Sequence, residues 1–141
     1  MQIITVSAVL FQRSDGHVLT VRKRSTTMFM LPGGKPESGE SAADCARREV
    51  AEELGIELSP DDIEPFGVWD AAAANEAGAI VRASVFRAAA SVAAAIEPRA
   101  QAEIAEVRWI DPAGGIDDEQ EAPLNRERVF PQLLRSVGDG S

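Results

Sequence analysis

The sequence predicts one α/β domain in which a mixed β-sheet carries helices on both faces. Segments rich in Val, Ile and Thr, which are typical of strands, alternate with segments that have a helical pattern. Their order along the chain is strands, one helix, further strands and a closing helix. A chain of 141 residues without an internal repeat is long enough for one hydrophobic core, so residues 1–141 are expected to form a single domain.

Two strands are expected at the start of the chain, over residues 2–11 and 17–24. They flank Asp15-Gly16, a strong signal for a two-residue hairpin turn. The two strands are therefore predicted to be antiparallel neighbours. His17, the one histidine of the sequence, lies at this hairpin, where a surface or turn role is expected rather than catalysis.

A capped helix is predicted next, over residues 41–54. Ser41 with Asp44 three positions later forms an N-terminal capping signal, and Gly55 stands where helices commonly end. A length of about 14 residues is ordinary for a helix. The sequence therefore marks both ends of this helix.

Three acids share one face of the predicted helix. At about 100° per residue, Glu49, Glu52 and Glu53 fall within one stripe. The opposite, core-facing side is formed by Ala43, Ala46, Val50 and Leu54. Because like charges at this spacing destabilise a helix, the acids are expected to converge on a cation, and carboxylate oxygens suit Mg²⁺, with Mn²⁺ as the alternative. The competing interpretation is a solvated acidic face.

The turn before the helix contains two adjacent glycines, Gly33 and Gly34. Because glycine has no side chain, the backbone there is open to a close approach. A carbonyl of this pair is expected to join the metal site, and an amide is expected to approach a phosphate. Gly34 is therefore a candidate metal ligand and Gly33 a candidate for substrate binding.

The second half of the chain predicts more strands and a closing helix. Three strands are expected, over residues 63–72, 79–89 and 106–110. Residues 88–95 are rich in alanine and are compatible with a strand or a helix. Residues 111–123 contain many acids and paired glycines, which indicates a loop. An amphipathic helix is expected over residues 126–137, followed by a flexible tail at about 138–141.

Residues 34–56, GKPESGESAADCARREVAEELGI, resemble the Nudix box, G-x5-E-x7-R-E-U-x-E-E-x-G-U with U aliphatic, at every specified position. With average residue usage, the fixed positions would coincide by chance on the order of a few times in a billion starts. The resemblance implies an α/β/α sandwich and a magnesium-dependent hydrolase that cleaves a pyrophosphate bond in a nucleoside diphosphate derivative. It is specific in the box and is expected to extend over the whole chain.

The resemblance also implies roles for single residues. In such enzymes Glu40 and Arg48 tie the loop to the helix, or Glu40 adds an outer metal ligand. The metal ligands that it implies are Gly34, Glu40, Glu49, Glu52, Glu53 and Glu103. The expected catalytic set is Arg48, Glu49, Glu53 and Glu103.

An acid just before the strand that carries Trp109 often completes the metal site or acts as the base in enzymes that resemble this chain. Glu103 is the first choice for this acid and Glu106 the second. Either Glu49 or Glu103 is expected to take a proton from the attacking water. For Glu103 and Glu106, a surface acid beside a strand is the competing interpretation.

The substrate is expected to be a nucleotide, with phosphates held partly by basic side chains near the site. The candidates are Arg22, Lys23, Arg24 and Lys35. Asn125, which opens the last helix, looks like the residue with which MutT-type enzymes read an oxidised guanine. Asn is also a good N-cap, and both interpretations stay open.

Three functions remain open from the sequence. The favoured one is hydrolysis of a (deoxy)nucleoside triphosphate to a monophosphate and pyrophosphate, with an oxidised nucleotide as a candidate substrate. The alternatives are hydrolysis of ADP-ribose or a nucleotide sugar, and a non-catalytic module that senses nucleotides. The intact set of box acids speaks against the sensor.

Composition narrows the expected partners and location. The net charge of −9 argues against binding of a nucleic-acid polymer, because phosphate backbones are held by surplus Lys and Arg. No apolar run is long enough for a membrane span and no signal peptide is apparent, so the cytoplasm is expected. The single cysteine, Cys45, excludes an internal disulfide and is assigned no chemistry. A homodimer stays among the expected states.

Overall fold

The computed structural model describes residues 2–139. Its strands are β1 (Gln2–Leu10), β2 (Val18–Lys23), β3 (Phe29–Met30), β4 (Gly33–Gly34), β5 (Ile63–Ala72), β6 (Ala79–Ala88) and β7 (Ile104–Ile110). Its helices are α1 (Ala42–Leu54), the short η1 (Pro60–Asp62), α2 (Ala90–Ala95), α3 (Pro112–Gly115), η2 (Asn125–Val129) and α4 (Phe130–Asp139).

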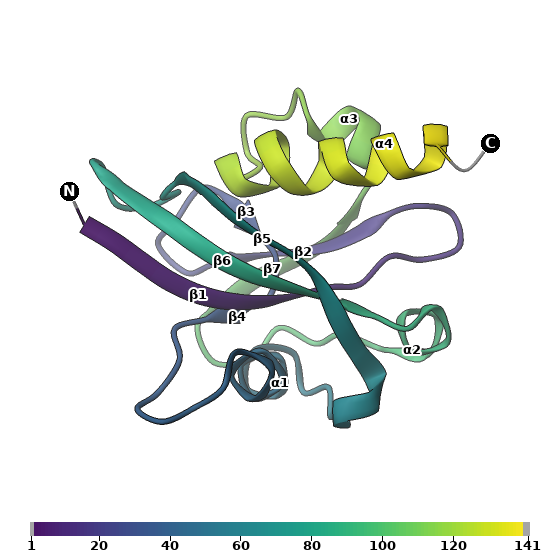
Figure 1. Ribbon diagram of the computed structural model, residues 1–141, viewed down its shortest axis with the longest axis horizontal. Helices are drawn as coiled ribbons and strands as arrows, with labels where there is room; N and C mark the ends of the chain where they lie inside the picture. The colour runs from purple at the N-terminus through teal and green to yellow at the C-terminus, as the bar shows by residue number, and fades with distance from the viewer. Residues whose placement is uncertain (1, 140–141) are drawn as a thin grey trace.

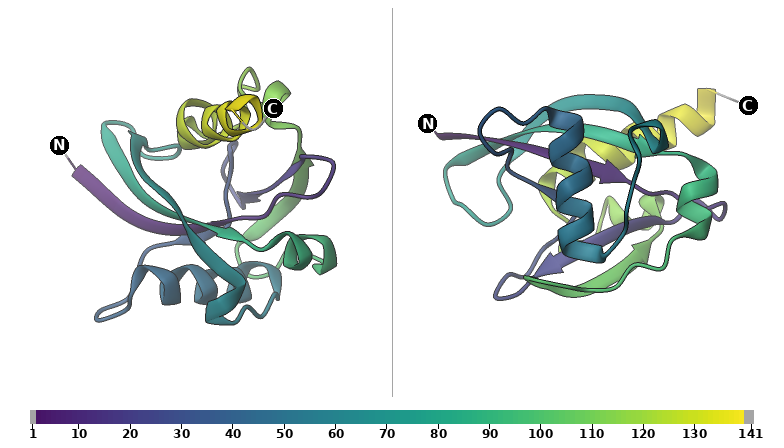
Figure 2. Two further views of the ribbon diagram at one scale, coloured as in Figure 1. Left: turned by 45° about the vertical axis from the view of Figure 1, so that its right-hand side comes forward. Right: turned by 90° about the horizontal axis from the view of Figure 1, so that it is seen from below.

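The strands form two sheets between two helical layers (Figure 1). The first sheet has the order β4-β1-β6-β5 and is mixed, because β1 runs parallel to β6 while the other neighbours are antiparallel. The second is antiparallel, with the order β3-β2-β7. Helix α1 covers one side of the sheets and α4 the other (Figures 1 and 2). The predicted sandwich with a mixed sheet is confirmed.

The second half of β1, from Ser7 to Leu10, and the next residue, Phe11, are buried on both sides, which explains how one strand supports both layers. Val9 and Phe11 belong to a core cluster that contains Val50 of α1. Ala8 and Leu10 alternate with them and belong to a second cluster, under α4. Successive side chains of a strand point to opposite faces. This alternation therefore determines which residues of β1 face α1 and which face α4.

Helix α1 is capped as predicted. The Ser41 hydroxyl accepts a hydrogen bond from the amide of Asp44 at 3.1 Å. At the other end Gly55 has a φ of 69° and donates its amide to the carbonyl of Ala51. A left-handed conformation of this kind favours glycine, so the helix ends where the sequence places its end.

The predicted pairing of the first two strands is wrong over most of their length. Beyond the turn, β1 pairs with β4 and β6, whereas β2 pairs with β3 and β7. The two segments pair near the turn, where Gln12 and Val18 form a bridge and the Leu19 amide donates to the Phe11 carbonyl at 3.0 Å. The loop also has three residues rather than two, because the Arg13 amide donates to the His17 carbonyl and Gly16 adopts a φ of 88°. His17 lies at this turn, as expected.

Several shorter elements differ from the predictions. Strand β7 starts two residues earlier than expected, and β3, β4 and η1 are too short to have a recognisable period. The alanine-rich segment divides between the end of β6 and helix α2. The predicted loop at 111–123 contains the one-turn helix α3, which Asp111 caps. Of the predicted tail, residues 140–141 lie outside the described residues.

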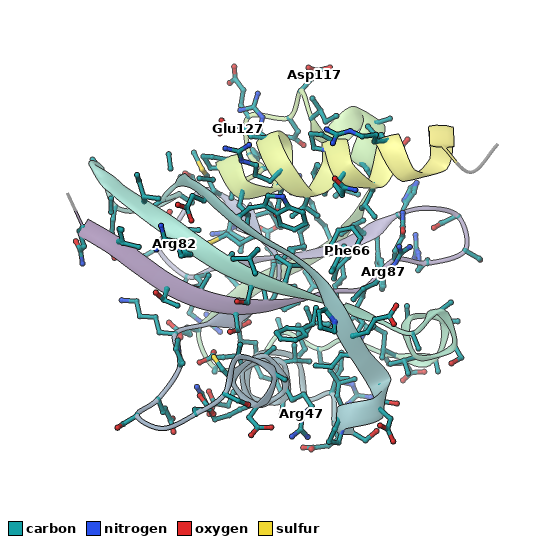
Figure 3. All side chains as sticks on the ribbon, viewed as in Figure 1. Arg47, Phe66, Arg82, Arg87, Asp117 and Glu127 are labelled. Atoms are coloured by element: carbon teal, nitrogen blue, oxygen red, sulfur yellow. The ribbon has the colours of Figure 1, made fainter. Side chains whose placement is uncertain are left out.

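Charged side chains lie on the outer faces of both layers. Arg47 projects beyond α1, and Glu127 lies on the opposite side of the molecule near α4 (Figure 3). Within residues 2–139, no helix has the length and apolar character needed to cross a membrane.

Candidate active site

The two glycines of β4 bring the backbone against helix α1. A side chain at Gly34 would place its Cβ 2.5 Å from the carboxyl carbon of Glu49. At Gly33 the same atom would lie 2.2 Å from the backbone oxygen of Ser7, which is paired with β4 in the sheet. A side chain would clash at both positions, but the neighbours differ: at Gly34 it would meet the end of the flexible Glu49 side chain, which can move, and at Gly33 it would meet rigid backbone.

Arg48 connects the acids of this region. Its guanidinium donates two hydrogen bonds to Glu40, at 2.7 and 2.9 Å, and one to Glu49 at 2.9 Å. It also contacts Glu52 at 3.3 Å and donates to the carbonyl of Lys35 at 3.2 Å. The bonds from Arg48 hold the pKa of Glu40 at about 2. Glu40 therefore ties the loop to the helix in this structure, with both carboxylate oxygens occupied.

Glu53 has the opposite environment. Only 2% of its surface is exposed, and its Oε1 accepts a hydrogen bond from the amide of Gly33 at 3.0 Å. Its Oε2 is buried and has no hydrogen-bond partner among the described residues. Burial raises the pKa of Glu53 to about 8, against a smaller lowering effect of the Gly33 bond. The Gly33 amide, expected to approach a phosphate, is thus used by a carboxyl group of the site.

In the structure, Glu49, Glu52 and Glu53 do not converge on one point, contrary to the expectation from the sequence. Among residues 2–139, no three His, Cys, Asp or Glu side chains are arranged to hold a metal ion. The physical reason is that Arg48 supplies the positive charge and turns Glu49 and Glu52 toward itself, while Glu53 turns toward Gly33.

The donor set nevertheless fits a hard divalent cation. Glu53 has a buried oxygen without a partner, Glu49 lies against the open backbone of Gly34, and Glu52 is accessible to solvent. Carboxylate and backbone oxygens are the ligands that Mg²⁺ and Mn²⁺ prefer. The residues that could hold the ion are therefore Glu49, Glu52, Glu53 and the Gly34 carbonyl.

The two acids proposed downstream have different surroundings. Glu103 is exposed and lies near enough to Glu53 to contribute to its raised pKa, although burial is the main cause. Its carbonyl accepts the amide of Arg24 at 2.7 Å. Glu106 accepts two hydrogen bonds from Arg22, at 2.6 and 2.9 Å. The carboxylate of Glu106 is therefore already paired, which leaves Glu103 as the better candidate.

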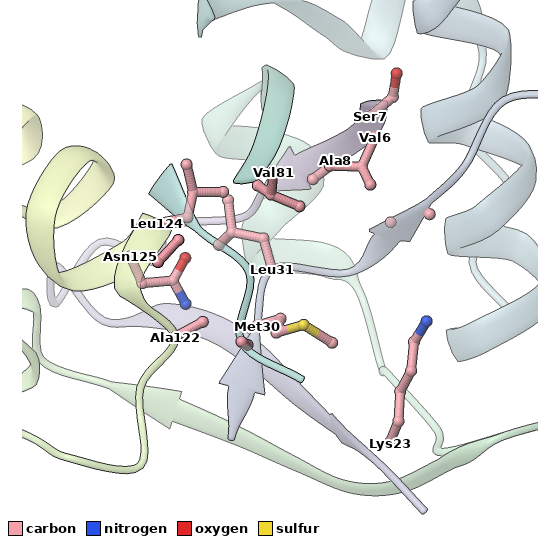
Figure 4. A pocket seen from close by; sticks show the side chains of 14 residues that line it. Val6, Ser7, Ala8, Lys23, Met30, Leu31, Val81, Ala122, Leu124 and Asn125 are labelled. Atoms are coloured by element: carbon pink, nitrogen blue, oxygen red, sulfur yellow. The ribbon is translucent and has the colours of Figure 1, made fainter. Parts of the chain in front are cut away.

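A pocket opens beside the glycines, with an empty volume of about 570 Å³ including its part open to solvent (Figure 4). Its walls are mostly apolar, and Val81 and Leu31 are among them. Lys23 and Asn125 lie on opposite sides of it in Figure 4. The pocket therefore runs from the acid region to the start of the last helix.

Of the basic side chains expected to bind phosphates, Lys23 lines this pocket. Arg22 is engaged by Glu106 and by the carbonyl of Thr26 at 2.8 Å. Arg24 is exposed and faces the carbonyl of Ala102 at 3.5 Å, and Lys35 is exposed in the loop before α1. The pocket, as the described residues form it, does not include Arg22, Arg24 or Lys35.

Asn125 is fully buried and lines the far end of the pocket. Its Nδ2 donates to Glu121 at 2.9 Å and faces the carbonyl of Phe29 at 3.5 Å, while its Oδ1 has no partner among residues 2–139. The N-cap interpretation is wrong: the N-cap of η2 is Leu124, and the side chain of Asn125 bonds to Glu121 instead of to a helix amide.

Glu121 is a fully buried carboxylate that the sequence analysis missed. Its carboxylate accepts a hydrogen bond from Nη2 of Arg108 at 2.6 Å and faces the hydroxyl of Thr20 at 3.4 Å. Burial raises its pKa, and the bonds from Arg108 and Asn125 oppose this effect. In the sequence Glu121 stands in an acidic run that reads as a surface loop, and its partners lie up to 101 residues away, so no local signal identifies it.

A model of the NUDIX domain matches residues 1–133. The chain belongs to the Nudix family. Among solved structures, the MutT protein from Methanosarcina mazei Go1 is similar, with a TM-score of 0.72 and 23% identity over 96% of both chains. The predicted membership of the Nudix family, with a MutT-like structure, is confirmed.

Two curated relatives match over part of the chain. The NAD-capped RNA hydrolase ndx-9 of Caenorhabditis elegans is 52% identical over 47 residues, which are 32% of this Nudix chain and 13% of that protein. The m7GpppN-mRNA hydrolase NUDT17 of Danio rerio is 36% identical over 70 residues, 45% of this chain and 23% of that protein. The chain thus spans less than a quarter of either relative. Because both names refer to capped RNA, the expected exclusion of a nucleic-acid polymer is not supported.

Proposed function

We propose that this chain is a magnesium-dependent pyrophosphohydrolase that converts a (deoxy)nucleoside triphosphate to a monophosphate and pyrophosphate. The observation that carries the proposal is that one continuous pocket joins Gly33 and Gly34, beside the box acids, to the buried Asn125. The pocket is polar at its two ends, at Lys23 and Asn125, and apolar between them, which matches the chemistry of a molecule with phosphates at one end and a planar base at the other.

Glu49, Glu52, Glu53 and the Gly34 carbonyl would hold the metal, with Mn²⁺ as the alternative to Mg²⁺. The cation supplies positive charge that stabilises phosphate oxygens and makes water more acidic. Arg48 keeps Glu49 and Glu52 in place through its bonds to both, and Glu40 anchors Arg48 from the loop side. Glu53, whose pKa burial raises to about 8, would have to be deprotonated to serve as a ligand of such a cation.

Glu49 is our choice for the base, with Glu103 as the alternative. Water attacks phosphorus, the bridging P–O bond breaks, and pyrophosphate leaves with the electron pair, while the base takes the proton of the water. Glu49 is half-buried against Gly34 inside the site, whereas Glu103 is exposed at its edge. Lys23 binds a phosphate from the pocket wall, and Asn125 contacts the base.

The test is a panel of nucleotides incubated with the purified protein and Mg²⁺, assayed for phosphate with and without added inorganic pyrophosphatase. Phosphate that appears only after pyrophosphatase treatment of a nucleoside triphosphate supports the proposal. An oxidised guanosine triphosphate and its normal counterpart belong in the panel because of Asn125. Absence of turnover with every member, at millimolar Mg²⁺ or Mn²⁺, contradicts it and favours a nucleotide-sensing module.

A second candidate function is cleavage of a dinucleotide that forms the cap of an RNA. It is favoured by the 52% identity to part of a protein named as an NAD-capped RNA hydrolase. NAD, ADP-ribose, a nucleotide sugar and a capped oligonucleotide therefore complete the panel. These substrates would yield two products that each carry phosphate, and no free pyrophosphate, which separates this candidate from the first.

A further inference from the structure

Arg22 and Lys23 are neighbours at the end of β2, but their side chains serve different surroundings. Lys23 lines the pocket (Figure 4), whereas Arg22 lies outside the walls that the described residues form and donates to Glu106. Successive side chains of a strand point to opposite faces, so this difference follows from the backbone. The end of β2 therefore gives one cation to the pocket and uses the other on the opposite face of the sheet.

The pairing of β2 with β7 changes register at this point. Arg22 is paired with Glu106. The next residue, Lys23, is paired with Ile104, so Ala105 is an extra residue of β7. A bulge of this kind bends the strand and redirects side chains. Nε and Nη2 of Arg22 donate to Glu106 at 2.9 and 2.6 Å, and this ion pair ties the two strands together where their ladder is interrupted.

The turn after β2 is held by hydrogen bonds to the backbone of Lys23. The hydroxyl and the amide of Thr26 both donate to the Lys23 carbonyl, at 2.8 and 3.2 Å. Nη1 of Arg22 donates to the Thr26 carbonyl at 2.8 Å. Inside this turn Ser25 has a φ of 65°, a left-handed conformation that persists only where the surrounding bonds impose it. Thr26 and Arg22 therefore fix the backbone from which the Lys23 side chain extends.

We propose that Arg22 and Thr26 are positioning residues that hold Lys23 toward the phosphates of the substrate, and that Arg22 does not bind phosphate itself. A lysine carries its charge on a flexible stem, so its contribution to binding depends on a backbone that is already in place. Glu106 completes the arrangement by anchoring Arg22. The inference rests on the proposed function, in which Lys23 binds a phosphate.

Thr26→Val removes the hydroxyl donor and keeps the shape of the side chain. We expect KM for the accepted nucleoside triphosphate to rise roughly 3-fold with little change in kcat, as for one lost hydrogen bond. In a Lys23→Met background the same substitution is expected to have no further effect on KM, because the lysine that it positions is absent. Thr27→Val, at an exposed neighbouring threonine, is the matched control and should keep the wild-type KM.

Glu106→Ala separates positioning from direct binding, because the two roles predict different results. The substitution frees the guanidinium of Arg22. If Arg22 holds the turn, KM should rise roughly 3-fold, as for one lost hydrogen-bonded partner. If Arg22 binds phosphate, the freed cation should leave KM unchanged or lower it. Glu64→Ala, which removes an exposed acid of β5 outside the pocket, is the control.

Binding of inorganic pyrophosphate with Mg²⁺, measured by calorimetry, should weaken in the same variants and requires no turnover. A wild type that binds pyrophosphate but hydrolyses no nucleotide therefore refutes the proposed function alone. The inference is overturned by a folded Thr26→Val variant with wild-type KM and pyrophosphate affinity, or by an equal effect of Thr26→Val with and without Lys23. An unchanged or lower KM in Glu106→Ala, or a wild type that does not bind pyrophosphate, also overturns it.

Discussion

The two ends of the pocket are built in different ways. At the acid end, the glycines of β4 and the charged face of α1 come from residues 33–53, one continuous run. At the base end, Asn125 depends on Phe29, Arg108 and Glu121, which lie on three separate segments. A capped helix can place side chains by spacing alone, whereas the base end exists only after the sheets have packed. The predictions below test this difference.

The largest expected effect is at the acid end. Glu52→Gln combined with Glu53→Gln removes two of the charges that would hold the cation, and we expect turnover to fall by roughly 10²-fold or more. The fold should remain, since Gln preserves the shape of both side chains. Glu57→Gln, an exposed acid just beyond α1, is the control and should leave turnover unchanged. Near-normal turnover in the double variant would refute the metal assignment.

The next prediction concerns Glu53 and pH without metal. Its pKa is about 8 in the folded protein and near 4.5 in the unfolded chain, so between these values the folded state binds an extra proton. The stabilisation from this proton is complete below about pH 4.5 and is lost as the pH rises through 8.

Relative to Glu53→Gln, the wild-type free energy of unfolding is therefore expected to decrease by roughly 3 kcal/mol between about pH 5 and pH 8. Denaturant unfolding of both proteins in a chelator would measure the difference. Mg²⁺ should reverse the loss and raise the melting temperature. Parallel pH profiles for the two proteins would show that Glu53 does not carry the extra proton.

The neighbouring glycines offer a sharper comparison. Gly33→Ala forces a methyl group against the Ser7 backbone, and we expect a loss of roughly 1–3 kcal/mol in stability. In Gly34→Ala the nearest atoms to the new methyl group belong to the carboxylate of Glu49, which can move, so stability should change little while turnover falls. Thermal melts and rates for both variants check the pair. Equal stability losses would contradict the different roles assigned to the two glycines.

The smallest effect is expected from the phosphate-binding lysine. Lys23→Met should raise KM by roughly 10-fold, as for one lost charge-assisted hydrogen bond, with a smaller change in kcat. Arg24→Met should change KM little, because Arg24 is exposed and does not line the pocket. A larger effect of Arg24→Met would restore the original assignment of Arg24 to phosphate binding.

Sequence reasoning succeeded where a local pattern determines structure. The ends of α1 follow from Ser41 and Gly55, and the proximity of the acids to Gly34 follows from the box spacing. It failed where tertiary contacts decide the strand pairing. Strands β1 and β2 are joined by a tight turn, but they belong to different sheets. It also left an N-cap role open for Asn125, which the structure contradicts. The side chain donates to the buried Glu121 instead, and this partner is recognisable only in the fold.

The most direct test of the account is a crystal structure of the protein with Mg²⁺ and a nucleoside triphosphate analogue whose α,β-bridging oxygen is replaced by methylene. The account predicts metal bound by Glu49, Glu52 and Glu53, a phosphate near Lys23, and the base in the pocket near Asn125. A base bound outside this pocket, or phosphates held away from the acids of α1, would contradict it.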